Sequence, residues 1–300
     1  MNTKFFLSAS ILCLALMTAS CKKDDENTDA GFTADQEVTK DQNQTDNEVE
    51  DISAMQDDLM ASNETKLYAR VAVVDTTYTI PFDSCATVTI IPKGTNPTGK
   101  ISVNYGTGCQ GRDGRYRKGI IEWTFTDRIR KPGAVLTTKF ISYGVKKTNS
   151  DSYIMVDNAS TKITTNMSSN EPIPGNTTFQ LRRDIGMKLI FPDNSTFSFL
   201  GTKDLVWDLG VLGYRWDNVY TMKAGSNLTG VDRKNRNYTM TVNTDVVRKA
   251  SCSLAGVFKP VSGKLTITHD AKTKVVDFGD GTCDNSVSVT INGKITRTRW

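Results

Sequence analysis

From Tyr68 to the C-terminus the chain repeats one pattern, short segments in which apolar and polar residues alternate. Two of these segments, Lys100–Tyr105 and Ser286–Asn292, alternate without a break. Successive side chains of a β-strand point to opposite faces, so this alternation predicts strands with one buried and one solvated face. Further segments of the same kind are Ile120–Thr126, Val135–Tyr143, Tyr153–Asp157, Thr177–Leu181, Asn237–Val242 and Lys264–Thr268.

The connections between these segments are short and rich in turn-forming residues, such as Pro132-Gly133 and Pro174-Gly175. Another, Pro192-Asp-Asn194, predicts a hairpin between Lys188–Phe191 and Thr196–Phe199. Parallel strands need crossovers of a dozen residues or more, so we expect antiparallel pairing. The fold is therefore predicted to be all-β, an antiparallel meander that forms a sandwich or a strongly curved sheet.

An internal repeat predicts two related halves, residues 64–150 and 151–300. The segment Ile101-Ser-Val-Asn-Tyr-Gly-Thr-Gly-Cys109 in the first half is echoed by Val275-Val-Asp-Phe-Gly-Asp-Gly-Thr-Cys283 in the second. Glycines permit the positive φ angles and the bulges at which a strand can end. We therefore expect a strand followed by a Gly-Cys turn in each half.

The first Gly-Cys turn contains a literal G-x-G-x-x-G at Gly106, Gly108 and Gly111. In dinucleotide-binding proteins this motif opens a helix whose N-terminal amides bind the pyrophosphate. Here basic residues and then the predicted strand Ile120–Thr126 follow. We interpret the glycines as a strand terminator, and we expect no nucleotide and no other cofactor or metal.

The N-terminus has the pattern of an export signal. Residues 1–20 combine Lys4, an apolar run and the small residues Thr18-Ala-Ser20, and Cys21 follows directly. A small-small-Cys ending resembles a bacterial lipobox, in which the signal is cleaved and the cysteine is lipidated. We therefore expect a lipid anchor at Cys21, which would attach the protein to a membrane.

An acidic leader separates this cysteine from the β-rich body. Residues 21–45 are polar and contain too few apolar groups for a core, which predicts a disordered tether. Residues 46–63 are predicted to form one amphipathic helix that packs on the body, because apolar residues recur there at helical spacing. The apolar positions are Val49, Ile52, Met55, Leu59 and Met60.

The charge is divided unevenly along the chain. Residues 22–66 carry 14 acidic and 4 basic side chains, whereas residues 67–300 carry 32 basic and 19 acidic ones. A basic body attracts anionic partners such as acidic glycans or lipopolysaccharide. We do not expect nucleic acid as a partner. The alternative to an external anionic partner is that the acidic leader of the same chain partly neutralises the positive charge of the body.

Three parts of the chain together resemble a group of uncharacterised Bacteroidota surface lipoproteins. They are the lipobox with its Lys-then-acidic tether, the segment "VNYGTGCQGRDGRYRKG" and the segment "VDFGDGTCDNSVSVTINGKI". The resemblance implies a lipid-anchored protein of the outer membrane, on the cell surface, with an all-β body. It implies no catalytic activity.

Four cysteines remain in the body, and an exported protein is expected to hold them as two disulfides. Three pairings are possible. The repeat favours Cys85–Cys109 and Cys252–Cys283, one bridge in each half. The second pairing requires a bulge or a kink, for which the segment Pro260–Gly263 is the expected place.

Two groups of residues are candidates for ligand binding. Trp207-Asp208 and Trp216-Asp217 flank a glycine-rich loop, and exposed indoles beside carboxylates suit sugar recognition; the alternative is that both tryptophans are core residues. The second group consists of basic residues at the two ends of one predicted strand, which would form an anion-binding patch if the ends met. Its members are Arg112, Arg115, Arg117, Lys118, Arg128, Arg130 and Lys131.

The sequence contains no recognisable catalytic constellation, and its only histidine, His269, lies in a predicted turn. We therefore expect a non-enzymatic binding or structural module that engages a glycan or another anionic polymer. Two alternatives stay open. One is a polysaccharide hydrolase that uses Asp208 and Asp217, and the other is a passive subunit of a surface lipoprotein assembly.

Overall fold

The computed structural model of the chain describes residues 52, 55, 59, 76–79, 85–91, 98–111, 114–146, 152–212, 214–253, 257, 259–269, 272–284 and 286–299. The predicted signal peptide, Cys21 and the predicted tether 21–45 lie outside these residues, and so does Arg112. Among the described residues, no helix is long and apolar enough to cross a membrane.

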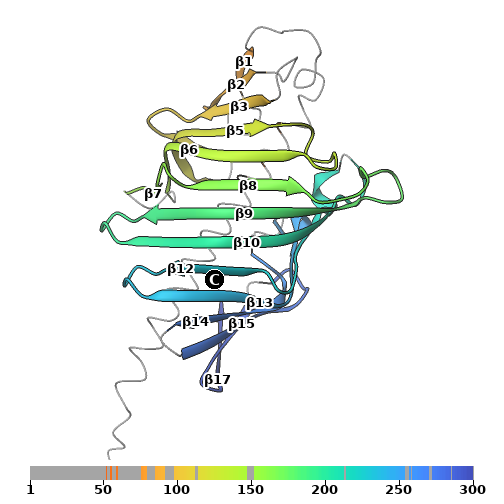
Figure 1. The fold of residues 1–300 in the computed structure, drawn as a ribbon. Coiled ribbons are helices and arrows are strands. Elements are labelled where there is room, and N and C mark those ends of the chain that lie inside the picture. The colour runs from red at the N-terminus through yellow and green to blue at the C-terminus, as the bar shows by residue number, and fades with distance from the viewer. Residues whose placement is uncertain are drawn as a thin grey trace, which may run out of the picture.

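The described strands form one antiparallel sheet (Figure 1). In chain order they are β1 (Thr76–Thr79), β2 (Thr87–Ile91), β3 (Gly99–Asn104), β4 (Cys109–Gln110), β5 (Tyr116–Phe125), β6 (Val135–Lys146), β7 (Ile154–Val156), β8 (Thr161–Asn166), β9 (Thr178–Ile190), β10 (Thr196–Asp208), β11 (Val219–Met222), β12 (Asn227–Val231), β13 (Asn237–Lys249), β14 (Ser262–His269), β15 (Lys272–Asp280), β16 (Ser286–Ile291) and β17 (Lys294–Arg299). Two short helices, η1 (Arg215–Asp217) and α3 (Ala250–Ser253), interrupt them.

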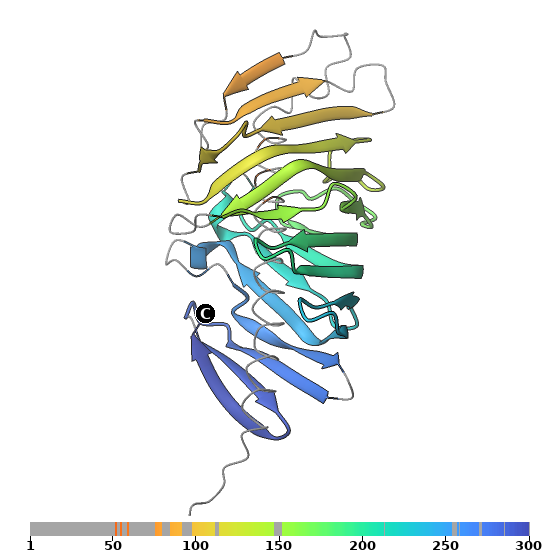
Figure 2. The ribbon, with the colours of Figure 1, turned by 90° about the vertical axis from the view of Figure 1, so that its left-hand side faces the viewer.

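The topology is a meander in which strands adjacent in sequence pair with each other. In two places a pair of short strands shares the same neighbours: β7 and β8 lie between β6 and β9, and β11 and β12 lie between β10 and β13. The predicted antiparallel meander is thus confirmed. Of the two predicted forms, the molecule adopts the curved single sheet, which twists and curls along its length (Figure 2).

Strand β9 is longer than the sequence predicts, because charged residues interrupt the alternation of apolar and polar residues in its middle. Its burial alternates over all 13 residues and unites two segments that the sequence predicts as separate strands, Thr177–Leu181 and Lys188–Phe191. The connecting residues include Arg182, Arg183 and Asp184, whose charges hide the pattern. Strand β10 continues the predicted Thr196–Phe199 in the same way, so this hairpin is much longer than predicted.

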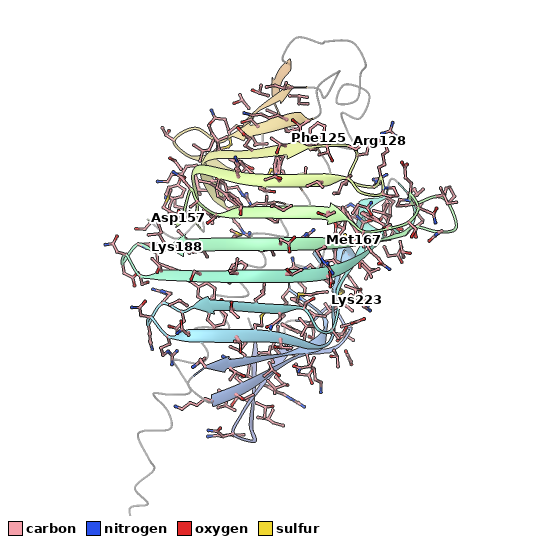
Figure 3. The ribbon with its side chains drawn as sticks, viewed as in Figure 1. Phe125, Arg128, Asp157, Met167, Lys188 and Lys223 are labelled. Atoms are coloured by element: carbon pink, nitrogen blue, oxygen red, sulfur yellow. A yellow bond between two sulfur atoms is a disulfide. The ribbon has the colours of Figure 1, made fainter. Side chains whose placement is uncertain are left out.

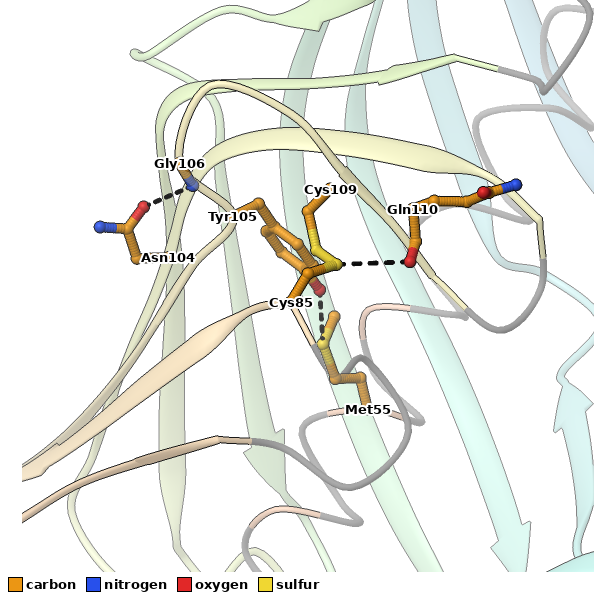
Figure 4. Close-up of a disulfide and its surroundings, with 7 residues drawn as sticks. All are labelled: Met55, Cys85, Asn104, Tyr105, Gly106, Cys109 and Gln110. Carbon is orange, nitrogen blue, oxygen red and sulfur yellow. Dashed lines mark hydrogen bonds between the residues drawn. A yellow bond between two sulfur atoms is a disulfide. The ribbon is translucent and has the colours of Figure 1, made fainter.

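The inward side chains of the curled sheet form one hydrophobic core, with Trp123, Phe125 and Phe140 among its largest members. Three residues of the predicted amphipathic segment, Ile52, Met55 and Leu59, are helical and buried in the same core. The Tyr105 hydroxyl donates a 2.9 Å hydrogen bond to the sulfur of Met55 (Figure 4). For these three residues, the predicted packing of a helical stripe on the body is confirmed.

Basic side chains also lie on the buried face, which the alternation did not predict. Lys162 of β8, Arg183 of β9 and Lys203 of β10 are each 2% exposed. Arg183 and Lys203 are direct cross-strand partners. Like charges placed opposite each other inside a protein are costly unless compensating groups offset them, so the pair Arg183 and Lys203 is an exception on a mostly apolar buried face.

Both disulfides have the pairing that the repeat favours, and each lies at the open end of a hairpin. Cys85–Cys109 flanks the hairpin β2–β3, and Cys252–Cys283 flanks β14–β15. The expected bulge lies at Gly263, where φ is +101° and the register between β14 and β15 shifts. The sheet runs without interruption past residue 150, because β6 pairs with both β7 and β8.

Candidate ligand-binding surface

The tryptophan pair does not form an exposed platform. Trp207, on the inward face of β10, is 4% exposed, and its ring lies 5.1 Å from that of Phe179 and 4.9 Å from that of Tyr220, centroid to centroid. Trp216 is half-buried in η1. For Trp207 the alternative that it belongs to the core is therefore correct.

The two carboxylates beside these tryptophans hold the intervening loop. Asp208 Oδ1 accepts hydrogen bonds from the Thr177 hydroxyl at 2.7 Å and from the Gly210 amide at 3.0 Å. These two bonds hold the pKa of Asp208 below its usual value. Asp217 Oδ2 accepts the Val211 amide at 2.7 Å. In this structure both side chains brace backbone amides of the glycine-rich loop.

The predicted basic patch does not assemble, because its members lie at opposite ends of β5. Arg115 and Lys118 are at the start of this strand, whereas Arg128 and Arg130 follow its end. A ten-residue strand is about 33 Å long, and Figure 3 shows Phe125 and Arg128 on the side of the sheet opposite Asp157 and Lys188. Individual members have separate roles. Arg117 is 5% exposed and points inward, and Lys131 forms a 2.6 Å ion pair with Asp127.

Lys118 instead belongs to a different cluster, which we call the tyrosine–lysine patch. It consists of Tyr116, Lys118, Lys146 and Tyr153, all half-exposed. Tyr116 and Lys146 are cross-strand partners on β5 and β6. Lys118 Nζ lies 4.7 Å from the centroid of the Tyr153 ring, and Lys146 Nζ lies 5.1 Å from it and 5.3 Å from that of Tyr116. Two ammonium groups thus converge on one aromatic ring.

The two lysines of this patch have no carboxylate partner among the described residues, whereas several other cations of the exposed face form ion pairs. Cross-strand carboxylates pair with Arg182 (Asp204, 2.9 Å) and with Lys264 (Asp277, 3.0 Å). Within the described ranges, no carboxylate lies within ion-pair distance of Lys118 or Lys146. Their contacts are with tyrosine rings, which leave the positive charge available to a ligand.

The glycines of the first Gly-Cys turn help to build the patch. The Gly106 amide donates to Asn104 Oδ1 at 2.8 Å (Figure 4), with φ at +59°. A Cβ atom on Gly108 would lie 2.8 Å from the Tyr153 hydroxyl oxygen, so Tyr153 packs directly over this glycine. Strand β5 follows the turn. The prediction that the G-x-G-x-x-G precedes a strand is confirmed.

The sequence singled out Lys118 but not its three partners. Alternation places Tyr116 and Lys118 on one face, which is a usable signal. The pairing of Tyr116 with Lys146 and of Lys118 with Gly144 depends on the register between β5 and β6, which shifts between Lys118 and Ile120 around Gly119. Gly119 has φ of +78°, and this bulge could not be located by pattern alone. Comparisons with protein-family models, curated proteins and solved structures find no match for this chain.

Proposed function

We propose that the protein is a lipid-anchored binding module of the outer-membrane surface that recognises an acidic glycan and carries out no catalysis. The anchor is Cys21 and the spacer is the acidic tether. The observation that carries the proposal is the tyrosine–lysine patch, a half-exposed cluster of two tyrosines and two lysines whose cations lack a carboxylate partner among the described residues.

The chemistry of the patch suits a sugar acid. A sugar ring presents C–H groups that pack on the face of a tyrosine, and a carboxylate or sulfate group on the same ring accepts hydrogen bonds from lysine. Lys118 and Lys146 both approach Tyr153, so one acidic group can contact both. A neutral sugar would not compensate the charges of the two lysines. A small inorganic anion would not pack on the tyrosine rings.

Binding of the full-length protein to an array of acidic and neutral glycans, at low and at physiological salt, tests the proposal. We expect acidic glycans to bind and to stay bound at physiological salt, because stacking is insensitive to screening. Tyr153→Ala should weaken this binding about tenfold, in line with the free energy of one aromatic contact.

Tyr214→Ala is the matched control, since Tyr214 is 54% exposed and lies outside the patch. It should leave binding unchanged. Binding that disappears at physiological salt, or an equal loss in both variants, would refute recognition at the patch.

A further inference from the structure

A groove crosses the exposed face of the sheet beside the tyrosine–lysine patch. Its volume is about 940 Å³, and it runs across β8, β9, β10, β12, β13 and β14. Hydroxyl and amide side chains line much of it, namely Thr161, Ser198, Thr229, Asn237, Thr239 and Thr268. Leu200 rises from the groove with 66% of its surface exposed.

The groove and the patch are adjacent. Strand β7 is only three residues long; Tyr153 of the patch precedes it, and Asp157 of the groove follows it. Four residues of extended chain span at most about 14 Å. At about 4.8 Å per strand, the path from β5 to β14 spans about 34 Å, so a ligand covering both must be a chain.

The two regions differ in charge. The two cations of the patch have no carboxylate partner among the described residues, whereas Lys188 and Asp157 of the groove face each other at 3.8 Å. The groove therefore presents balanced charge, hydroxyl groups and apolar side chains, among them Leu200 and Val231. Such a lining suits uncharged, hydroxyl-rich sugars, which hydrogen-bond to hydroxyl and amide groups.

We infer that the groove holds the continuation of the glycan whose acidic sugar binds at the tyrosine–lysine patch, and that its hydroxyl and amide side chains contact the uncharged sugars of that continuation. The ligand class is then a polysaccharide in which acidic sugars are separated by uncharged ones, and it lies across the strands. This inference rests on the proposed function and adds to it a second subsite and a minimum chain length.

Calorimetric titration of the full-length protein with hyaluronan oligosaccharides tests the inference, since glucuronate alternates with an uncharged sugar in this polymer. We expect a dodecasaccharide to bind about tenfold more tightly than a tetrasaccharide, a difference of about 1.4 kcal/mol. Leu200→Glu should remove this gain and leave tetrasaccharide binding unchanged. Ile295→Glu is the control, because Ile295 is equally exposed (65%) and lies on β17.

The outcomes separate the inference from the proposed function. Equal affinity for both lengths, or a gain that survives Leu200→Glu, would overturn the groove subsite. If either outcome occurred while Tyr153→Ala still weakened tetrasaccharide binding, the groove subsite would be wrong and recognition at the tyrosine–lysine patch would be retained. Failure of both lengths to bind would overturn the inference, and the glycan array would then decide the proposed function on its own.

Discussion

Gly106 and Gly108 are two residues apart in the first Gly-Cys turn, but each is needed for a different reason. Gly106 has φ of +59° and open space around it, whereas Gly108 leaves room for the Tyr153 hydroxyl. We expect Gly108→Ala to displace the flexible end of Tyr153 and to weaken glycan binding several-fold with little change in stability. Gly106→Ala should lower the free energy of unfolding by about 1 kcal/mol and leave binding unchanged.

Urea unfolding and glycan titration of these two variants provide the measurement, and each variant is the control of the other. If Gly108→Ala lowered stability and left binding intact, the packing of Tyr153 over this glycine would not matter for the patch.

A second prediction at the residue scale concerns acid stability. The hydroxyl and the amide of Ser195, and then Arg233, hold the pKa of Asp193 at about 2 in the turn between β9 and β10. Because this pKa is lower in the folded state than its usual value of 3.8, ionised Asp193 favours folding. This contribution is complete above about pH 4 and is lost as the pH falls through 2.

Asp193→Asn should therefore lower the unfolding midpoint at neutral pH, and the difference from the wild type should shrink between pH 4 and 2. Urea titrations over this pH range measure it. A difference that stays constant with pH would show that the charge of Asp193 has no part in stability.

At the scale of elements, each disulfide closes the open end of a hairpin. The bridges span 24 and 31 residues, so removing either one should lower the free energy of unfolding by about 3 kcal/mol. Their effects on binding should differ. Cys109 is the neighbour of Gly108 under Tyr153, whereas Cys252–Cys283 belongs to β14–β15.

We expect Cys85→Ala/Cys109→Ala to weaken glycan binding and Cys252→Ala/Cys283→Ala to leave it unchanged. Urea unfolding and titration of the two double variants under the same conditions give both quantities. Equal losses of binding in the two variants would mean that the first bridge has no particular role in the patch.

The elements also show what could be predicted from the sequence. Strands with clean alternation, such as β3 and β16, were predictable because one residue in two must be apolar on a half-buried sheet. The bulge at Gly263 was predictable because the disulfide in the second half requires it. The full length of β9 was not, because charged residues occupy both of its faces.

The binding surface was less predictable than the fold, for a physical reason. Trp207 and Asp208 have the composition of a sugar site, but the inward face of β10 buries the indole and the loop uses the carboxylate. The tyrosine–lysine patch joins residues from β5 and β6 with Tyr153, which directly precedes β7, and its geometry depends on the bulge at Gly119. Composition alone contains no information on that register.

At the scale of the whole molecule, the single curled sheet has one face that buries the hydrophobic core and one that is exposed (Figures 1 and 2). Residues 67–300 have an excess of basic over acidic side chains, 32 against 19. Ion pairs such as Arg182–Asp204 and Lys264–Asp277 neutralise part of this excess locally. Specific binding is therefore expected at the patch, and diffuse attraction elsewhere should be screened by salt.

The most direct test of this account compares two double variants that lose the same charge. Lys118→Ala/Lys146→Ala removes both cations of the patch, and Lys294→Ala/Arg297→Ala removes two exposed cations from β17, away from the groove. The measurement is the affinity of each for hyaluronan dodecasaccharide at physiological ionic strength. We expect the first variant to bind about tenfold or more weakly, because it loses charge-assisted hydrogen bonds to the ligand, and the second to bind as tightly as the wild type. Equal affinities of the two variants would contradict the account, because binding would then follow net charge and not the tyrosine–lysine patch.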